Sequence, residues 1–316
     1  MLKSASERLL PWTVYPATLL LAIGAHLALL NAGFPVITSA YLPVLVSALL
    51  VTGLEHAIPY RPDWKPRRSD IENDALFMIV VQVLLPRMVA LLAVITLLDP
   101  LRSLRPAMAA LWPDHWSLAA QVLFMLISAE LLRYWLHRLA HTWPLLWRLH
   151  AVHHSPEKLY WLNVGRFHPL EKALQFVLDA LPFMLLGVGE QVVALYFVFY
   201  SINGFFQHSN IRLRYGLLNY LISTAELHRW HHSRISDESN HNYGNNLIVW
   251  DLVFGTWFLP TEGSISDIGL RNPDYPKSFA AQMSAPFLRG ISDKAAPPPD
   301  TASQPGAAPL HDTHRL

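Results

Sequence analysis

The sequence contains no cysteine and few charged residues. Without cysteine the chain forms no disulfide, no cysteine-ligated metal site and no thiol nucleophile, so metal chemistry must use histidine, aspartate or glutamate. Charged residues make up 15% of the 316 residues, against about 25% in an average soluble domain. The 24 Lys and Arg nearly cancel the 23 Asp and Glu. Because such a chain lacks the basic field that holds a nucleic acid backbone, we expect no nucleic-acid partner.

Apolar residues, in contrast, form 52% of the chain. Four near-continuous apolar runs, each close to the roughly 20 residues with which a helix crosses a bilayer, cover residues 12–30, 34–54, 75–98 and 116–136. A fifth apolar region, 173–206, is too long for one crossing and is interrupted by Pro182 and by Gly187-Val188-Gly189. These breaks predict a helical hairpin. The expected fold is all-α, a transmembrane bundle of about four spans plus this hairpin, with a histidine-rich helical cap.

Basic residues in the short loops indicate which side of the membrane each loop faces. Four of them lie between the second and third runs, at Arg61, Lys65, Arg67 and Arg68, which places this loop in the cytoplasm. Counting the crossings onward brings two histidine-rich stretches, 137–168 and 208–241, to the same face. We therefore expect a multi-pass integral membrane protein whose histidine-rich cap and active site lie on the cytoplasmic face.

Composition divides the chain into three parts. Residues 1–115 contain the N-terminal transmembrane helices and the cytosolic loop, and residues 116–293 contain the histidine clusters. Residues 294–316 are rich in Pro, Ala and Ser, which is typical of disorder. The predicted domains are therefore an N-terminal membrane segment, a catalytic domain and a disordered tail.

The histidines recur at metal-ligand spacing. An HxxxH pair continues the fourth apolar run, and the pattern HxxHH follows it twice. On a helix, residues three and four apart lie on one side, so each motif could chelate a metal. These eight imidazoles are more than one tetrahedral ion uses, and two further histidines would raise the total to ten, so the pattern favours two metal ions. The eight are His137, His141, His150, His153, His154, His228, His231 and His232, and the additional two are His168 and His208.

Imidazole nitrogen suits iron, zinc and copper, whereas calcium and magnesium prefer oxygen. A zinc hydrolase usually has a glutamate near the metal as general base, and the sequence contains no HExxH. A metal transporter would need polar ligands inside its spans, whereas these clusters follow the spans. Two irons at the mouth of an apolar bundle would suit oxygen attack on an unactivated C–H bond of a lipid. A zinc-dependent membrane hydrolase and a metal transporter remain as alternatives.

Several of these segments resemble the fatty acid hydroxylase/sterol desaturase superfamily of integral-membrane di-iron oxygenases. The resemblance covers about 120 residues in the family's order. Its segments are HRLAH at 137–141, LHAVHHS at 149–155, FHPLEK at 167–172, FQHSN at 206–210, LHRWHHS at 227–233 and NYGNNLIVWDLVFGT at 242–256. The resemblance implies a lipid hydroxylase with a cytosolic centre of two iron ions, held almost wholly by the ten histidines named above. A lipid or sterol desaturase with the same centre is the alternative.

The family resemblance also implies dioxygen as co-substrate, a membrane lipid (fatty acyl, sterol or related) as substrate and electrons from outside the chain. The chain has neither the His-Pro-Gly-Gly motif of a cytochrome b5 domain nor a dinucleotide fingerprint. We therefore expect an external donor: a ferredoxin, a cytochrome b5-like protein or a reductase. Behind the ligands, Asp251 either accepts a ring N–H from a ligand histidine or caps a local turn. Asn242 and Tyr243 either hydrogen-bond near the metal or build the turn before Gly244.

Overall fold

The computed structural model describes residues 5–98, 105–261, 265, 267–288 and 290–291. Within these ranges the chain is helical, with three isolated β-bridges and no strand. The predicted all-α class is therefore confirmed. The tail predicted over 294–316 lies outside the described residues.

The helices follow the apolar runs and the histidine motifs. In chain order they are α1 (Ala5–Asn31), α2 (Val36–Ala57), α3 (Arg68–Leu76), α4 (Leu85–Ala93), α5 (Arg105–Ala109), α6 (Leu118–Thr142), α7 (Pro144–His154), α8 (Pro169–Asp179), α9 (Leu181–Leu185), α10 (Glu190–His208), α11 (Ala225–His231), α12 (Ser236–Ser239), α13 (Val249–Val253) and α14 (Phe279–Ser284). Two π-helical segments, η2 (Phe77–Leu84) and η3 (Val94–Leu98), extend α3 and α4. Short 3-10 turns are η1 (Pro62–Trp64), η4 (Trp161–Gly165), η5 (Gly216–Tyr220) and η6 (Ala285–Phe287).

Four helical stretches are long and apolar enough to cross a membrane, in agreement with the four predicted runs. They are Leu9–Asn31, Val36–Ala57, Arg68–Leu97 and Leu118–Thr142. The third stretch begins at Arg68, earlier than the predicted residue 75. Its first turns are helical but polar, so a search for apolar residues does not detect them. Leucines such as Leu20 and Leu49 are 69% and 73% exposed on these helices. Lipid is the solvent that suits such a surface, and the chain is a multi-pass membrane protein.

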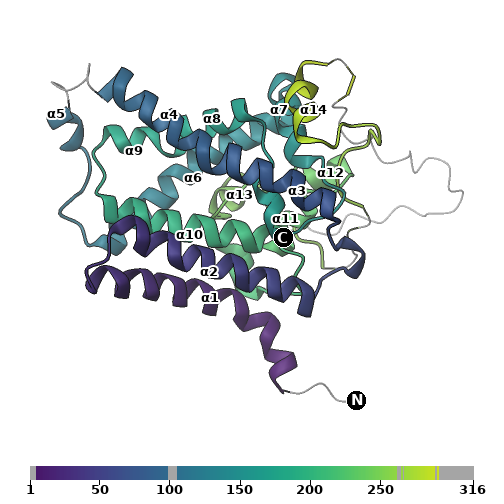
Figure 1. Ribbon diagram of the computed structural model, residues 1–316, viewed down its shortest axis with the longest axis horizontal. Helices are drawn as coiled ribbons and strands as arrows, with labels where there is room; N and C mark the ends of the chain where they lie inside the picture. Colours follow the sequence, from purple (N-terminus) through teal and green to yellow (C-terminus); the bar gives the residue numbers. More distant parts are fainter. Residues whose placement is uncertain (1–4, 99–104, 262–264, 266, 289, 292–316) are drawn as a thin grey trace, which may run out of the picture.

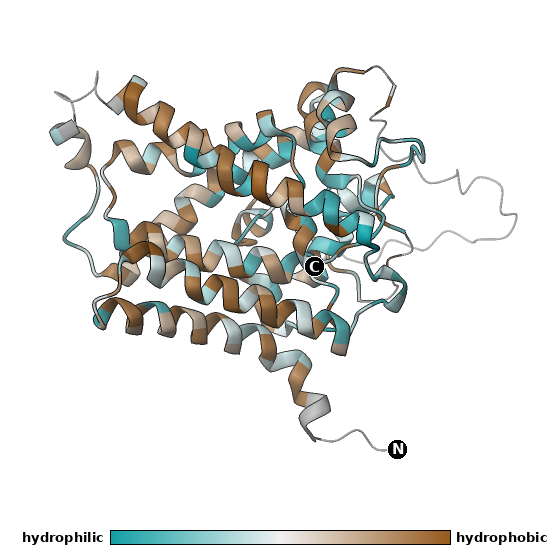
Figure 2. Ribbon diagram, viewed as in Figure 1, coloured by the Kyte–Doolittle hydropathy of each residue, from teal (hydrophilic) through white to brown (hydrophobic). Residues whose placement is uncertain are grey.

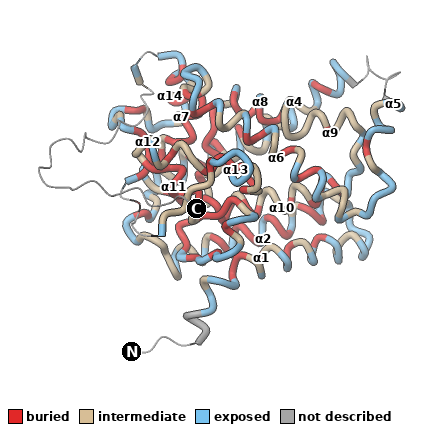
Figure 3. Tube along the Cα trace, turned by 180° about the vertical axis from the view of Figure 1, so that it is seen from behind, coloured by how far each residue is buried: buried red, intermediate tan, exposed pale blue. Residues whose placement is uncertain are grey.

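Hydrophobic and hydrophilic residues separate along the length of the bundle. Figure 2 shows hydrophobic colours along α1, α2 and α4, and hydrophilic colours at the end where α3, α11 and α12 gather. Figure 3 shows many buried segments at that same end, around α7 and α11. The polar end is therefore a packed cap rather than a set of exposed loops.

The predicted helical hairpin is present. Its first arm is divided into α8 and α9 at Ala180, just before Pro182. The turn lies at Gly187, which adopts a φ of +67° that glycine tolerates at little cost. The second arm, α10, then returns to the polar end and finishes at His208. The hairpin thus carries a candidate ligand back to the other histidines.

Helices α1, α2 and α10 lie side by side (Figure 1). Their contact buries an apolar cluster that includes Tyr15, Val44 and Ile202. Inside it, the Tyr15 hydroxyl donates a hydrogen bond to Asn203 Oδ1 at 2.9 Å. This core joins residues on both sides of position 115, and the domain boundary expected there stays a prediction.

Candidate metal centre

Nine histidines form two groups whose ligating nitrogen atoms lie within 4.8 Å of one another in each group. Group one contains His137 and His141 from α6, His150 and His154 from α7, and His231 from α11. Group two contains His153 from α7, His208 from α10, and His228 and His232 from α11 and its C-terminal cap. The structure thus brings together nine of the ten predicted ligands, and it places them in two separate sets.

Each HxxHH motif contributes to both groups. His150 and His154, four apart on α7, belong to group one, and His153 between them belongs to group two. On α11 the arrangement is reversed, because His228 and His232 belong to group two and His231 to group one. The sequence analysis placed each triplet on one side of its helix, but the i+3 ring turns toward the other group. The motif therefore links two neighbouring sites.

The Nε2 atoms converge to distances that suit a shared cation. In group one, the Nε2 atoms of His137 and His150 lie 3.0 Å apart. The Nε2 atom of His154 lies 3.1 Å from that of His141 and 3.1 Å from that of His231. In group two, the Nε2 atom of His228 lies 2.9 Å from that of His208 and 3.0 Å from that of His232. With metal–nitrogen bonds of about 2.0–2.1 Å, neighbouring nitrogens around one ion lie about 3.0–3.4 Å apart. The ring spacing fits a coordination sphere in each group.

Several of these rings turn Nδ1 away from the convergence and toward an oxygen acceptor, whereas Nδ1 of His228 and of His232 has no hydrogen-bond partner in the part of the chain that the structure describes. His137, His231 and His153 each face a backbone carbonyl, of Tyr243 at 2.6 Å, His241 at 2.8 Å and Arg166 at 3.2 Å respectively. A carbonyl only accepts, so each of these Nδ1 atoms carries the proton and each Nε2 presents a lone pair. Lone pairs that face each other repel unless a cation lies between them. This tautomer pattern is the one that metal-ligating histidines adopt.

Burial keeps the rings neutral. It lowers the pKa of His150, His153 and His154 on α7 well below the usual value, and neighbouring histidines lower it further. Burial lowers the pKa of His231 to about 4. A neutral imidazole is the form that binds a metal, so these rings are ready to ligate at neutral pH.

Glu171 is a buried carboxylate behind group one that the sequence analysis did not single out. Its Oε1 lies 2.8 Å from His150 Nδ1 and also accepts a hydrogen bond from Gln175 at 3.1 Å. Burial raises the pKa of Glu171 to about 8, and a cation bound to His150 would favour the ionised carboxylate. The signal was available, since Glu171 follows His168 by three residues in the FHPLEK segment.

Two asparagines also face ligand rings. Asn163 Oδ1 lies 2.9 Å from His208 Nδ1, and Asn240 Oδ1 lies 3.3 Å from His141 Nδ1. Asn163 is part of η4, whose final Gly165 packs closely against η2, since a Cβ there would lie 3.1 Å from the Met78 Cα atom. Neither asparagine is marked by a motif, because its role depends on contacts between distant segments.

In the structure, Asp251 is hydrogen-bonded to the turn around Asn242. Asp251 accepts backbone N–H bonds from Tyr243 at 2.8 Å and Gly244 at 2.7 Å, and a hydroxyl bond from Thr256 at 2.7 Å. Asn242, at a φ of +57°, bonds to the Leu227 and Phe258 backbone. Asp251 therefore acts on the ligands only through the turn, because it fixes the peptide whose Tyr243 carbonyl faces His137.

His168 is not in either group, which corrects the prediction that it is a ligand. It caps the N-terminus of α8, where its Nδ1 accepts the Leu170 N–H at 3.3 Å. Its Nε2 lies 3.2 Å from the Met283 carbonyl oxygen. Since both ring nitrogens are occupied by these contacts, His168 shapes the start of the helix that carries Glu171.

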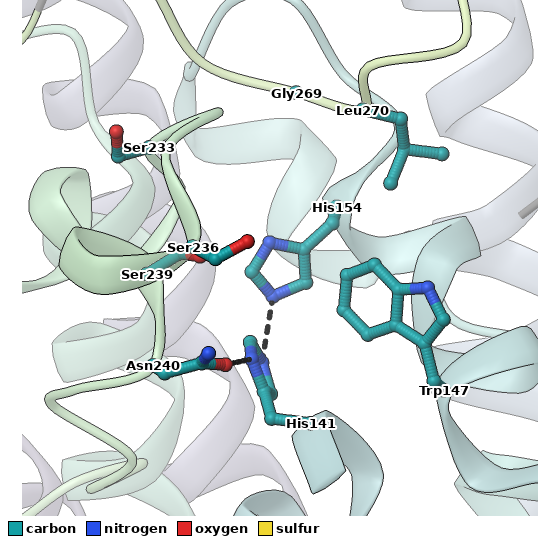
Figure 4. Close-up of a pocket in the computed structure, with 9 residues that line it drawn as sticks. All are labelled: His141, Trp147, His154, Ser233, Ser236, Ser239, Asn240, Gly269 and Leu270. Atoms are coloured by element: carbon teal, nitrogen blue, oxygen red, sulfur yellow. Dashed lines mark hydrogen bonds between the residues drawn. The ribbon is translucent and has the colours of Figure 1, made fainter. Parts of the chain in front are cut away.

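A small pocket of about 10 Å³ reaches group one from the polar end. Figure 4 shows Trp147, Asn240 and Ser236 around the contact between His141 and His154. Its volume is about that of one water-sized probe. Group one is therefore nearly closed on this side.

A larger cavity of about 540 Å³ reaches both groups from the membrane side. Its walls come from α2, η2, α4, α6, η4, α8, α9 and α10, and most of its surface is apolar. His137 and His150 of group one line it, as do His153, His208 and His228 of group two. The lining also includes Leu45 and Arg87, which are exposed on the outer surface of α2 and α4. The cavity thus joins the lipid-facing side of the bundle to the histidines.

Comparisons with known proteins agree with this arrangement. Residues 122–256 match the family model described as fatty acid hydroxylase, and both histidine groups lie inside this range. The chain is 35% identical to the ornithine lipid hydroxylase OlsE of Rhizobium tropici over 250 residues, which are 78% of this chain and 74% of that protein. It is 30% identical to the alkylglycerol monooxygenase of Homo sapiens over 140 residues, which are 44% of this chain and 31% of that protein. No solved structure matches the chain.

Proposed function

The chain belongs to the fatty acid hydroxylase family and is a membrane oxidoreductase, and from this premise we propose that it hydroxylates a C–H bond in a membrane lipid. The main supporting observation is that one mostly apolar cavity touches both histidine groups and is also lined by Leu45 of α2 and Arg87 of α4, which are exposed on the outer surface of the bundle. A lipid can enter such a cavity from the bilayer without crossing water. Its relatives are named for ornithine lipid hydroxylation and alkylglycerol oxygenation, and both names describe oxidation of a lipid.

The proposed cofactor is a pair of iron ions, one in each histidine group. The fit is supported by the Nε2 spacing and by the Nδ1 protons, both of which suit metal-ligating imidazoles. When bound, the irons would supply the activation of dioxygen. Nine histidines are proposed as ligands: His137, His141, His150, His154 and His231 for one ion, and His153, His208, His228 and His232 for the other.

The chain itself would position the substrate and exclude water. The apolar walls of the cavity hold the lipid chain, and the buried histidines stand where the cavity meets the polar cap. The carbonyls and carboxylate behind the rings fix their orientation, so the ligand nitrogens need no rearrangement when a metal binds. Exclusion of water protects reactive oxygen species from side reactions.

We further propose that the centre faces the cytoplasm. The support comes from the basic loop at Arg61, Arg67 and Arg68, which lies at the histidine end because Tyr60 and Asn210 are hydrogen-bonded there at 3.0 Å. Positive loops favour the cytoplasmic side. Electrons would come from a separate donor on that side, a ferredoxin, a cytochrome b5-like protein or a reductase.

Metal analysis combined with lipid profiling tests this function. Detergent-purified full chain, produced with iron-57 and without added zinc, is expected to contain about two irons per chain with a coupled Mössbauer signal. Membranes from cells that express the chain should contain a lipid that has gained one oxygen atom. A lipid that has lost two hydrogens would identify a desaturase instead. One zinc per chain, with no iron after anaerobic ferrous reconstitution, would contradict the proposal and favour a hydrolase.

A further inference from the structure

One wall of the large cavity carries charged side chains close to the histidines. Arg133 from α6 and three residues of α8, Glu171, Lys172 and Asp179, line this wall. Arg133 is paired with Asp179, with Nη1 and Oδ2 3.0 Å apart. Glu171 is engaged with His150 at 2.8 Å. Both carboxylates of the wall therefore already have partners.

Lys172 is a buried cation on this wall, 7% exposed. Its Nζ donates to two neutral oxygen atoms, Tyr200 Oη at 3.1 Å and Gln175 Oε1 at 3.3 Å. Among the described residues, no carboxylate forms an ion pair with it. A charge removed from water needs a compensating charge nearby. The wall has as many carboxylates as cations, but both carboxylates are paired with other residues, so Lys172 has no counter-ion in direct contact within the described ranges.

Lys172 also lies close to group two. Its Nζ is 5.7 Å from the centre of the Phe167 ring, and that ring stacks on His153 with centroids 4.2 Å apart. One aromatic ring thus separates the ammonium group from a proposed ligand. Because Tyr200 Oη accepts from Lys172, its own O–H is free to donate into the cavity that it lines.

We propose that Lys172 and Tyr200 bind an anionic group, a carboxylate or a phosphate, in the headgroup of the lipid substrate. The apolar remainder of the cavity then holds the chain, and the oxidised carbon lies within a few bonds of the anionic group. This inference rests on the proposed function, since it takes the cavity as the substrate site. It makes Lys172 the residue that selects anionic lipids over neutral ones.

Binding of three probes with the same tail tests this selection. Hexadecanoate, hexadecyl phosphate and hexadecanol are titrated into the full chain in mild detergent, without reductant, so that no turnover occurs. The wild-type chain is expected to bind the two anions at least about tenfold more tightly than the alcohol, as charge-assisted hydrogen bonds predict. Lys172→Gln should remove this preference while its affinity for hexadecanol stays unchanged, and Lys172→Arg should keep it.

Tyr200→Phe should reduce the preference less than Lys172→Gln does, since it removes a donor and no charge. Lys65→Gln is the matched control, because Lys65 is exposed and does not line the cavity. It should bind all three probes like the wild type. Equal wild-type affinity for the three probes, or a preference that persists in Lys172→Gln, would overturn the proposal. Displacement of hexadecyl phosphate by millimolar inorganic phosphate would also overturn it, because the site would then hold free anions rather than headgroups.

The binding result is independent of the oxygenase result. If the probes bind equally while iron-loaded protein still adds oxygen to membrane lipid, headgroup selection is wrong and the proposed function stands. If the anions bind selectively through Lys172 but the chain holds no iron and oxidises no lipid, the proposed function is wrong. In that case the cavity is an anionic-lipid site of another kind.

Discussion

His150 Nδ1 lies 2.8 Å from Glu171 Oε1, and His150 Nε2 lies 3.0 Å from His137 Nε2. The same ring therefore joins a buried carboxylate to the centre of group one. A carboxylate that accepts the Nδ1 proton orients the ring and makes its Nε2 a better donor to a metal. Glu171 thus holds one ring of group one in place from behind.

Glu171→Gln should weaken metal binding. An amide accepts a weaker hydrogen bond and carries no negative charge, so we expect iron affinity to fall by about 10–100-fold. The measurement is iron per chain after dialysis against a graded series of chelator concentrations. Glu190→Gln is the control, because Glu190 is exposed at the start of α10. An unchanged iron titration in Glu171→Gln would show that the carboxylate has no effect on the metal.

Substituting His154 and His168 in turn distinguishes the effect of losing a proposed metal ligand from that of losing a helix cap. His154→Ala removes a ring whose Nε2 lies 3.1 Å from both His141 and His231 Nε2, and it should lose iron and at least about tenfold of the activity. His168→Ala removes an N-terminal cap of α8 and should cost about 1 kcal/mol of stability while iron stays bound. Iron content and thermal unfolding of both variants are measured together. The assignment fails if His168→Ala loses iron and His154→Ala retains it.

These two residues also show what sequence spacing can and cannot predict. His154 could be predicted because HxxxH and HxxHH place rings on a helix at ligand spacing, and the spans can be predicted from apolar runs. His168 was misassigned because its sequence neighbours resemble a motif, whereas its contact to Met283 joins segments 115 residues apart. Asn163 and Asn240 were missed for the same reason, since each meets its histidine only after η4 and α12 pack against α10 and α6. The division of each triplet between two groups likewise depends on how α7 and α11 face each other.

Gly244→Ala tests whether the turn behind His137 needs a glycine. A Cβ at this position would overlap the Leu247 carbonyl oxygen and lie 3.1 Å from Asp251 Oδ2. We expect a loss of about 1–3 kcal/mol in the free energy of unfolding, followed by weaker metal binding because the turn carries the Tyr243 carbonyl. Thermal unfolding in detergent measures the first effect. Gly53→Ala is the control, since a Cβ there meets nothing within 4 Å and alanine favours the helix by about 1 kcal/mol. Equal stability of both variants would contradict the crowding argument.

Acid should destabilise the metal-free protein. Burial lowers the pKa of His231 to about 4 in the folded state, against about 6.5 for an unfolded histidine. The unfolded chain therefore binds more protons in this range, so stability is fully present above pH about 6.5 and is lost as the pH falls toward about 4. His231 alone contributes on the order of 3 kcal/mol to this loss. The histidines of α7, whose pKa values are also lowered, should make the loss of stability with falling pH steeper.

The midpoint of thermal unfolding, measured after chelation at a series of pH values from about 7.5 to 4.5, should fall steadily below pH about 6.5. Iron-loaded protein should resist acid to a lower pH, because bound metal competes with protons for the same Nε2 atoms. His231→Gln should flatten the curve of the chelated protein, since glutamine does not titrate. A midpoint that stays constant over this range in the chelated wild type would mean that the rings are not buried as neutral imidazoles, and the convergence of their lone pairs would then lose its basis.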